Sequence, residues 1–150
     1  MQRTLAIIKP DSVELNLVGK IVACIEERFH IVGMKMLRLS KVAAERFYIV
    51  HKDKPFYDEL VGFMMSGPIF VMVLEGENVI KEFRHFVGAT DPKKAEENTI
   101  RKMCGTSIRE NAIHGSDSEE AANFEIHFFF SDLELVRWKH GYAKEEILSF

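Results

Sequence analysis

His114 is the residue of this sequence whose type and setting best suit covalent chemistry. It lies in the string Asn111-Ala112-Ile113-His114-Gly115-Ser116-Asp117-Ser118, between a short apolar run and a polar stretch that can begin a helix. A neutral imidazole is a nucleophile at neutral pH because its lone pair needs no prior deprotonation. Gly115 leaves the approach to the ring open, and a helix N-terminus beside it favours negative charge. The setting indicates attack on an anionic group, although most histidines in proteins are structural.

Lysine and arginine side chains must hold any phosphate, because the sequence has no glycine-rich phosphate loop. The nearest candidate, Gly19-Lys20-Ile21, lacks the upstream glycine and the hydroxyl residue of the pattern GxxxxGK[ST]. Guanidinium groups can bind phosphoryl oxygens in a bidentate manner and offset charge that develops in phosphoryl transfer. Arg84 lies between two phenylalanines in an apolar helical pattern, which suggests the edge of a pocket.

The composition is typical of a globular protein, and we expect one domain over residues 1–150 with residues 131–150 as a C-terminal tail. Hydrophobic residues make up 47% of the chain, but no run reaches the roughly 18 apolar residues that a membrane span needs. The apolar run at residues 5–8 is too short for a signal peptide, and Cys24 and Cys104 form no CxxC pair. We therefore expect a cytoplasmic protein with free thiols and no membrane association.

Hydrophobic spacing predicts strands that alternate with helices around the chemistry-bearing residues. Strands are expected at residues 3–9, 31–39, 69–74 and 112–114, and helices at residues 17–28, 40–50, from 55 to the stop at 66–68, 78–87 and from Asp117 or Ser118 to 129. The polar segment 89–98 reads as a functional loop. Two βαβ-type halves in this order predict an α/β (α+β) fold, a ferredoxin-like sandwich whose four-stranded antiparallel sheet has helices packed on one face.

The string around His114 also resembles the active-site motif of the nucleoside diphosphate kinase family. Further strings match that family in order and at its spacing: TLAIIKPD at residues 4–11, HKDKPFY at 51–57, SGP at 66–68, LEGEN at 74–78, GATDP at 88–92 and TIR at 99–101. The resemblance covers about residues 3–130, and so many collinear matches make it specific.

The resemblance implies a phosphotransferase that acts through a phosphohistidine at His114. It would pass the terminal phosphoryl group from a nucleoside triphosphate such as ATP to a nucleoside diphosphate such as GDP by a ping-pong mechanism. Glu125 would hydrogen-bond the second ring nitrogen, and Ser116 would orient Glu125. The remaining five histidines have no matching role and are expected to be structural or exposed: His30, His51, His85, His127 and His140.

The resemblance also implies how a nucleotide would be held. Phe56 matches the ring on which the base stacks, and stacking discriminates weakly among bases because every base has a π-face. Mg²⁺ would arrive with the nucleotide phosphates, since no carboxylate cluster marks a dedicated metal cage and no residue is expected as its ligand. The other matching positions are Leu60 and Ile108 beside the base, Asn111 and Lys9 at the ribose 3′-hydroxyl, Tyr48 near the transferred phosphate, and Lys9, Arg84, Thr90 and Arg101 at the phosphates.

One segment next to a proposed phosphate-binding residue departs from the family pattern. Lys102-Met103-Cys104 follows Arg101 where the family usually has Gly-Asp and an aromatic residue. The change makes the positions of Arg101 and Ile108 less secure than that of His114. A further hypothesis is that Lys102 adds a cation near the phosphates.

Two other classes of function compete with the enzyme. A catalytically inactive nucleotide-binding regulatory protein should have lost one of the chemical residues, yet His114, Glu125 and Lys9 are all retained. A nucleic-acid-binding protein needs a dense basic surface, which a net charge of −3 without a basic block disfavours. The resemblance further implies a homo-oligomer, a hexamer or a tetramer with preference for the hexamer, and the segment 89–98 and the tail near Trp138 are candidate interfaces.

Overall fold

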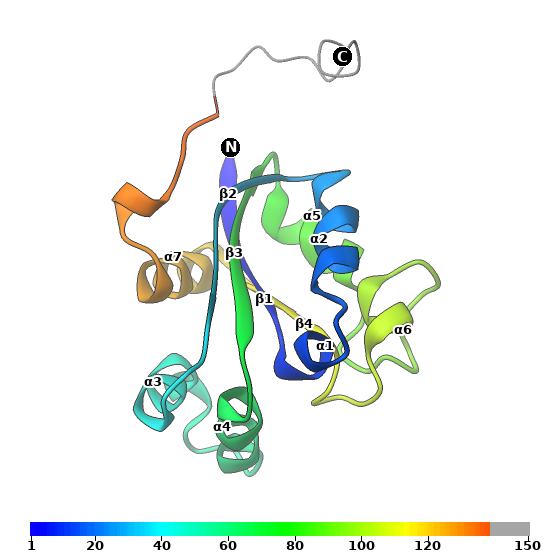
Figure 1. The fold of residues 1–150 in the computed structure, drawn as a ribbon, viewed down its shortest axis with the longest axis vertical. Helices are drawn as coiled ribbons and strands as arrows, with labels where there is room; N and C mark the ends of the chain where they lie inside the picture. Colours follow the sequence, from blue (N-terminus) through cyan, green and yellow to red (C-terminus); the bar gives the residue numbers. More distant parts are fainter. Residues whose placement is uncertain (139–150) are drawn as a thin grey trace.

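A four-stranded antiparallel sheet forms the centre of the computed structural model, which describes residues 1–138 (Figure 1). The strands are β1 (Gln2–Ile8), β2 (His30–Leu37), β3 (Ile69–Gly76) and β4 (Ile113–Gly115), in the spatial order β2-β3-β1-β4. Every neighbouring pair is antiparallel, and β1 lies between β3 and the short edge strand β4. The predicted ferredoxin-like fold class is confirmed.

Within the described residues the chain also forms seven helices and two short 3₁₀ turns. Two of the helices were not predicted. Pro10 was read only as the end of a strand, but it opens a helix at the first-turn position, where the fixed φ of proline is favourable. The helices are α1 (Pro10–Glu14), α2 (Val18–Glu26), α3 (Lys41–Phe47), α4 (Tyr57–Met65), α5 (Val79–Val87), α6 (Ile100–Cys104) and α7 (Glu119–Phe129), and the turns are Ile49–His51 and Asp132–Glu134.

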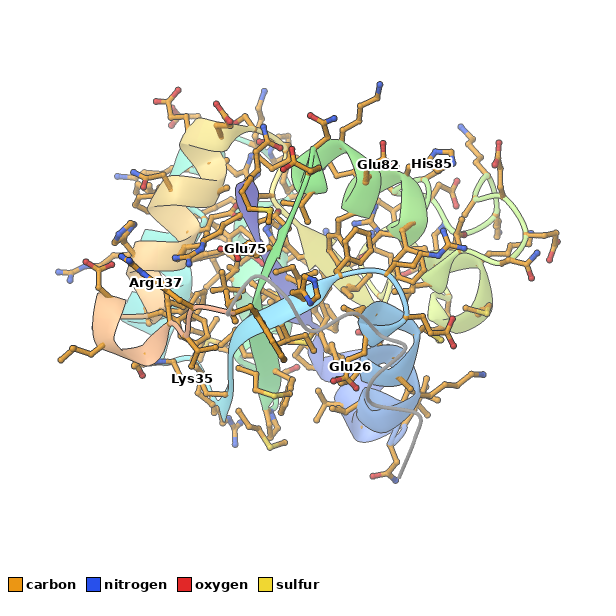
Figure 2. All side chains as sticks on the ribbon, turned by 90° about the horizontal axis from the view of Figure 1, so that it is seen from above. Glu26, Lys35, Glu75, Glu82, His85 and Arg137 are labelled. Atoms are coloured by element: carbon orange, nitrogen blue, oxygen red, sulfur yellow. The ribbon has the colours of Figure 1, made fainter. Side chains whose placement is uncertain are left out.

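Helices cover both faces of the sheet, so the expectation of one covered face is wrong in that detail. Helices α2 and α5 lie on one side of the sheet and α7 on the other (Figure 1). The view from above agrees, with Glu82 and His85 of α5 and Glu26 of α2 across the sheet from α7 (Figure 2). The physical reason stands in β1, where five consecutive residues from Thr4 to Ile8 are fully buried. A strand without apolar–polar alternation is one that is covered on both sides.

Caps and turns fix where several of these elements begin. Ser118 rather than Asp117 caps α7, because its side chain accepts the N–H of Ala121. Ser40 caps α3 in the same way. Asn78 precedes α5 in a left-handed conformation but makes no side-chain cap, so its side chain does not play the predicted part.

The segment after α7 lies along the exposed edge of β2. The Val136 N–H donates to Val32 O at 2.8 Å, and Trp138 Nε1 donates to Ile31 O at 3.2 Å. Trp138 is thus held on the edge strand of its own chain. The rest of the predicted tail, with His140, lies outside the described residues. No helix within residues 1–138 is long and apolar enough to cross a membrane.

Candidate active site

His114 lies in the middle of β4, opposite Ile7 of β1. Its Nε2 is 3.0 Å from Glu125 Oε2, and its side chain is 21% exposed. The edge of the Phe47 ring packs against the imidazole, with the ring centroids 5.9 Å apart. Nδ1 makes no hydrogen bond within the described residues, and the ring lines a cleft. The nitrogen not held by Glu125 is therefore the one available to react.

Glu125 is held from behind by a buried serine. Ser116 Oγ donates to Glu125 Oε2 at 2.5 Å and accepts the N–H of Leu5 at 3.1 Å. Ser116 is fully buried, and Leu5 belongs to the central strand. A chain of hydrogen bonds thus runs from the sheet backbone through Ser116 and Glu125 to His114, and it fixes the imidazole ring in one orientation.

Lys9 and Asn111 form a second buried polar pair next to the imidazole. Lys9 Nζ donates to Asn111 Oδ1 at 2.7 Å, and Asn111 Nδ2 donates to Thr90 O at 3.0 Å. Lys9 is 7% exposed and Asn111 is 1% exposed. Burial, with the nearby charge of Arg101, lowers the pKa of Lys9 to about 8. The ammonium is therefore weakly solvated and suited to an anionic partner.

Arg101 is fixed by two backbone carbonyl groups. Its Nη1 donates to Gly88 O and its Nη2 to Ile113 O, both at 3.0 Å. Its Nε is buried and has no hydrogen-bond partner within the described residues. Burial, with the charge of Arg84, lowers the pKa of Arg101 to about 10. Two guanidinium groups that repel each other in this way favour a bound anion between them.

One open cleft of about 800 Å³ brings together most of the predicted residues. Glu125 and Ser116 stand behind the imidazole rather than in the cleft. Arg84 lines a neighbouring cavity of about 710 Å³, which shares Thr90 and Arg101 with the cleft. The predicted residues that line the cleft itself are Lys9, Tyr48, Phe56, Leu60, Thr90, Arg101, Ile108, Asn111 and His114.

Tyr48 has a buried hydroxyl at the end of the cleft that holds His114. The hydroxyl has no hydrogen-bond partner within the described residues. Burial, with the charge of Glu125, raises the pKa of Tyr48, so the phenol stays protonated. It can donate to a ligand that enters the cleft.

The opposite end of the cleft is apolar and open. Phe56 is 40% exposed and Ile108 is 62% exposed, although both are large hydrophobic side chains. They approach from different segments, Phe56 from the start of α4 and Ile108 from the loop before β4. Two exposed apolar groups that line one cleft from different segments offer surfaces on which a flat ring can pack.

His51 also lines the cleft, although the resemblance assigned it no role there. Its ring stacks on Tyr48 and lies 5.5 Å from the Phe56 ring, measured between centroids. His51 lies in the string of residues 51–57 that carried the resemblance, and this position was the sign that it belongs with Phe56. Four further charged residues line the cleft and were not predicted as site residues: Glu59, Asp91, Lys93 and Arg109.

Lys102 does not supply a cation to the cleft, contrary to our hypothesis. Its Nζ lies 4.0 Å from a carboxylate oxygen of Glu97, and it lines neither cavity. The segment Lys102-Met103-Cys104 forms part of α6, where successive side chains point about 100° apart. Arg101 therefore faces the cleft while its neighbour turns away.

No group of three or more His, Cys, Asp or Glu side chains within residues 1–138 could hold a metal ion. The two carboxylates that line the cleft, Glu59 and Asp91, come from different segments. The donors of the cleft are thus cationic and neutral groups suited to phosphate oxygens.

Comparison with known proteins agrees with this arrangement. The family model for nucleoside diphosphate kinase matches residues 2–135. The nucleoside diphosphate kinase of Persephonella marina is 58% identical over 137 residues, which cover 91% of this chain and 98% of that protein. The enzyme of the same name from Citrifermentans bemidjiense is 58% identical over 91% of this chain and all of that protein.

Solved structures show the same likeness in three dimensions. The nucleoside diphosphate kinase of Aquifex aeolicus superposes with a TM-score of 0.87 at 48% identity, covering 90% of this chain and 99% of that one. A halophilic nucleoside diphosphate kinase from Halobacterium salinarum, in complex with CDP, gives a TM-score of 0.89 at 40% identity over 99% of this chain and 98% of that one. The chain therefore belongs to the nucleoside diphosphate kinase family of phosphotransferases.

Proposed function

We propose that this protein passes the terminal phosphoryl group of a nucleoside triphosphate, ATP among them, to a nucleoside diphosphate through a phosphohistidine at His114. The observation that carries the proposal is the His114–Glu125 contact of 3.0 Å, which engages Nε2 and leaves Nδ1 to the cleft. A histidine so oriented has a fixed tautomer, with its lone pair on the reacting nitrogen.

In the first half-reaction, the Nδ1 lone pair attacks the terminal phosphorus. A P–N bond forms, the P–O bond to the leaving diphosphate breaks, and its electron pair stays on the diphosphate oxygen. The imidazole becomes a cation, which the carboxylate of Glu125 stabilises. In the second half-reaction, a terminal oxygen of another diphosphate attacks the same phosphorus, the P–N bond breaks, and neutral His114 is restored.

The cationic groups of the cleft stabilise the charge that builds on the phosphoryl oxygens. Arg101 and Arg84 flank the place where phosphates would lie, and Tyr48 and Thr90 offer hydroxyl donors. In this proposal Lys9 and Asn111 contact the ribose 3′-hydroxyl, and Lys9 also contacts the phosphates. Mg²⁺ belongs to the substrate in this proposal and is carried by the nucleotide phosphates, since the cleft offers no cage of carboxylates.

The slot between Phe56 and Ile108 receives the base, with Leu60 beside it. The bound CDP of the Halobacterium salinarum enzyme supports a nucleotide site in a relative of the same fold. Stacking alone serves every base. The phosphate end of the cleft then lies next to His114, where transfer occurs.

The test is covalent labelling with ATP carrying labelled γ-phosphate. We expect the purified protein to acquire one acid-labile label per chain, and GDP or another diphosphate to remove it. His114→Ala should acquire none while keeping its fold by circular dichroism. A protein that binds nucleotide but never acquires label would instead be the catalytically inactive nucleotide-binding regulatory protein.

We also propose a cytoplasmic homo-oligomer, a hexamer or a tetramer. Exposed apolar side chains on β2 and in the segment that follows α7 support association, with Met34 at 47%, Met36 at 56% and Val136 at 56% exposure. Light scattering coupled to size-exclusion chromatography distinguishes six chains of 17.3 kDa from four, and a monomer at micromolar concentration would contradict the proposal.

A further inference from the structure

An ion pair joins the two walls of the slot that receives the base. Arg109 Nη1 contacts Glu59 Oε1. Glu59 lies on α4 next to Leu60, and Arg109 lies in the loop 105–112 next to Ile108. Within residues 1–138 no other hydrogen bond or ion pair joins α4 to that loop. Within the described residues, the Arg109–Glu59 ion pair is therefore the polar link between α4 and the loop that carries Ile108.

Arg109 is more enclosed than a surface arginine. Its side chain is 22% exposed, whereas that of Glu59 is 77% exposed, and both line the cleft. A guanidinium carries five N–H donors, and Arg109 makes no hydrogen bond within the described residues apart from its contact with Glu59. Donors on Nε and Nη2 thus remain for a ligand in the cleft, in a side chain that the carboxylate of Glu59 holds in place.

We propose that Arg109, held by Glu59, reads the edge of the base and makes this site prefer guanine among the nucleobases. The inference rests on the proposed function, because it assumes that the base occupies the slot between Phe56 and Ile108. The contact of Arg109 would add base selectivity to a slot in which stacking alone discriminates weakly among bases.

The hydrogen-bonding edges of the bases give the preference its direction. Guanine offers O6 and N7 as two adjacent acceptors, which match the fork of a guanidinium, and its N1–H and amino groups suit a carboxylate such as Glu59. Adenine presents an amino group in place of O6, which opposes the donors of Arg109. The single ring of a pyrimidine lacks the N7 acceptor altogether. One bidentate contact of this kind discriminates between bases by roughly tenfold or more.

The experiment measures kcat/KM of the phosphorylated enzyme with GDP, ADP, CDP and UDP. We expect the wild-type protein to favour GDP over CDP by roughly tenfold or more, and Arg109→Ala to bring the four values within about threefold of one another. Arg109→Lys keeps the charge but loses the fork, so it should lose the preference as well. Lys54→Ala removes one exposed charge near the cleft without lining it, and it should keep the wild-type ratio.

The ratio of kcat/KM values between diphosphates with different bases distinguishes base recognition by Arg109 from a structural role. If Arg109 only braced the loop, Arg109→Ala would lower all four values together and leave their ratios unchanged, which would overturn the inference. Equal values for the four diphosphates in the wild-type protein would also overturn it. If no phosphoenzyme forms, the proposed function fails instead, and calorimetric affinities for GDP and CDP then decide the preference of Arg109 independently of transfer.

Discussion

The two ends of the cleft differ in how firmly their side chains are held. At the phosphate end, Lys9, Asn111 and Ser116 are each at most 7% exposed, and every one of them is hydrogen-bonded to another residue of the site. At the base end, Phe56 and Ile108 are 40% and 62% exposed. In the proposed mechanism, bonds form and break at the closely held end, whereas the base would bind at the exposed end.

This difference follows from what each end has to do. Charge that develops during phosphoryl transfer is stabilised best by groups that are already in place, because no reorganisation is then needed. Stacking depends on contact area alone and tolerates small displacements. We therefore expect substitutions at the phosphate end to act on kcat, and substitutions at the base end to act mainly on KM.

Glu125→Gln should give the largest effect. The substitution keeps the size of the side chain but removes the charge that stabilises the imidazolium, so kcat should fall on the order of a hundredfold. Stopped-flow or coupled assays of kcat measure it, with Glu120→Gln on the exposed side of the same helix as the control. A kcat within threefold of the wild-type value would show that Glu125 is not needed to stabilise the cation.

Gly88→Ala should damage the phosphate end through the backbone. Gly88 has a φ of +96°, and an added Cβ would lie 2.5 Å from Thr99 Oγ1. Thr99 caps α6, which carries Arg101, and Gly88 O accepts from the Arg101 guanidinium, so the clash disturbs the helix cap and one of the two carbonyl contacts of that side chain. We expect a loss of about 3 kcal/mol of stability and a Tm lower by roughly 10 °C.

The matched control for that variant is Gly19→Ala in α2. No heavy atom lies within 4 Å of the added Cβ at Gly19. Alanine is the better helix former, so this control should gain about 0.5–1 kcal/mol. A Tm for Gly88→Ala equal to that of the wild-type protein would mean that the contact with Thr99 relaxes without cost.

Alkaline pH should weaken the phosphate end before it affects the base end. Lys9 has a pKa lowered to about 8, so the free enzyme loses this cation as pH rises through 8. The kcat/KM value should decline by about tenfold per pH unit above that point, and Lys9→Ala should lack the decline. The profile of kcat should bend at higher pH, since bound phosphates favour the charged ammonium.

The same group has the opposite effect on stability. Its folded pKa lies below the unfolded value of 10.5, so between pH 8 and 10.5 the unfolded chain binds more protons than the folded one. The contribution of Lys9 to the free energy of unfolding therefore rises with pH across this window. Comparing denaturation midpoints of the wild-type protein and Lys9→Ala at pH 8 and 10 isolates it, and a difference that does not change with pH would contradict the shifted pKa.

Ile108→Ala should give the smallest effect. Because the side chain is 62% exposed, its loss should raise KM for diphosphates by less than about threefold and leave kcat unchanged. Ile100→Ala is the informative contrast, since Ile100 is 1% exposed and its truncation should cost about 2–5 kcal/mol of stability. A lowered kcat for Ile108→Ala would show that the base end also positions the phosphates.

Much of the fold follows from patterns that lie within single elements. The apolar runs of β1 and β3 and the helical spacing of α2 and α5 are visible in the sequence, and their bounds agree with the structure to within about two residues. The five-residue helices α1 and α6 were not predicted, because five residues form little more than one turn and show no periodicity. Whether α7 covers the same face as α5 depends on a crossover that no local pattern records.

The sequence predicts the site less well where it is formed by contacts between segments that are distant in the chain. His114 and its neighbours stand out by residue type and by resemblance, and their roles remain predictions. The pairing of Glu59 with Arg109 joins residues that are 50 positions apart in the chain, and neither carries a motif. Lys102 illustrates the reverse case, since a cation adjacent to Arg101 in sequence points elsewhere once α6 forms.

Arg101 also donates a hydrogen bond to a backbone carbonyl on the outer edge of β4. Lys9 N–H donates to Ala112 O and Ser116 N–H donates to Leu5 O, so alternate residues of β4 face β1 and the carbonyl of Ile113 faces outward. Arg101 occupies that carbonyl in the manner of a neighbouring strand. A phosphate bound by the guanidinium would therefore affect the strand that carries His114, and amide hydrogen exchange at residues 113–115 would report occupancy of the cleft.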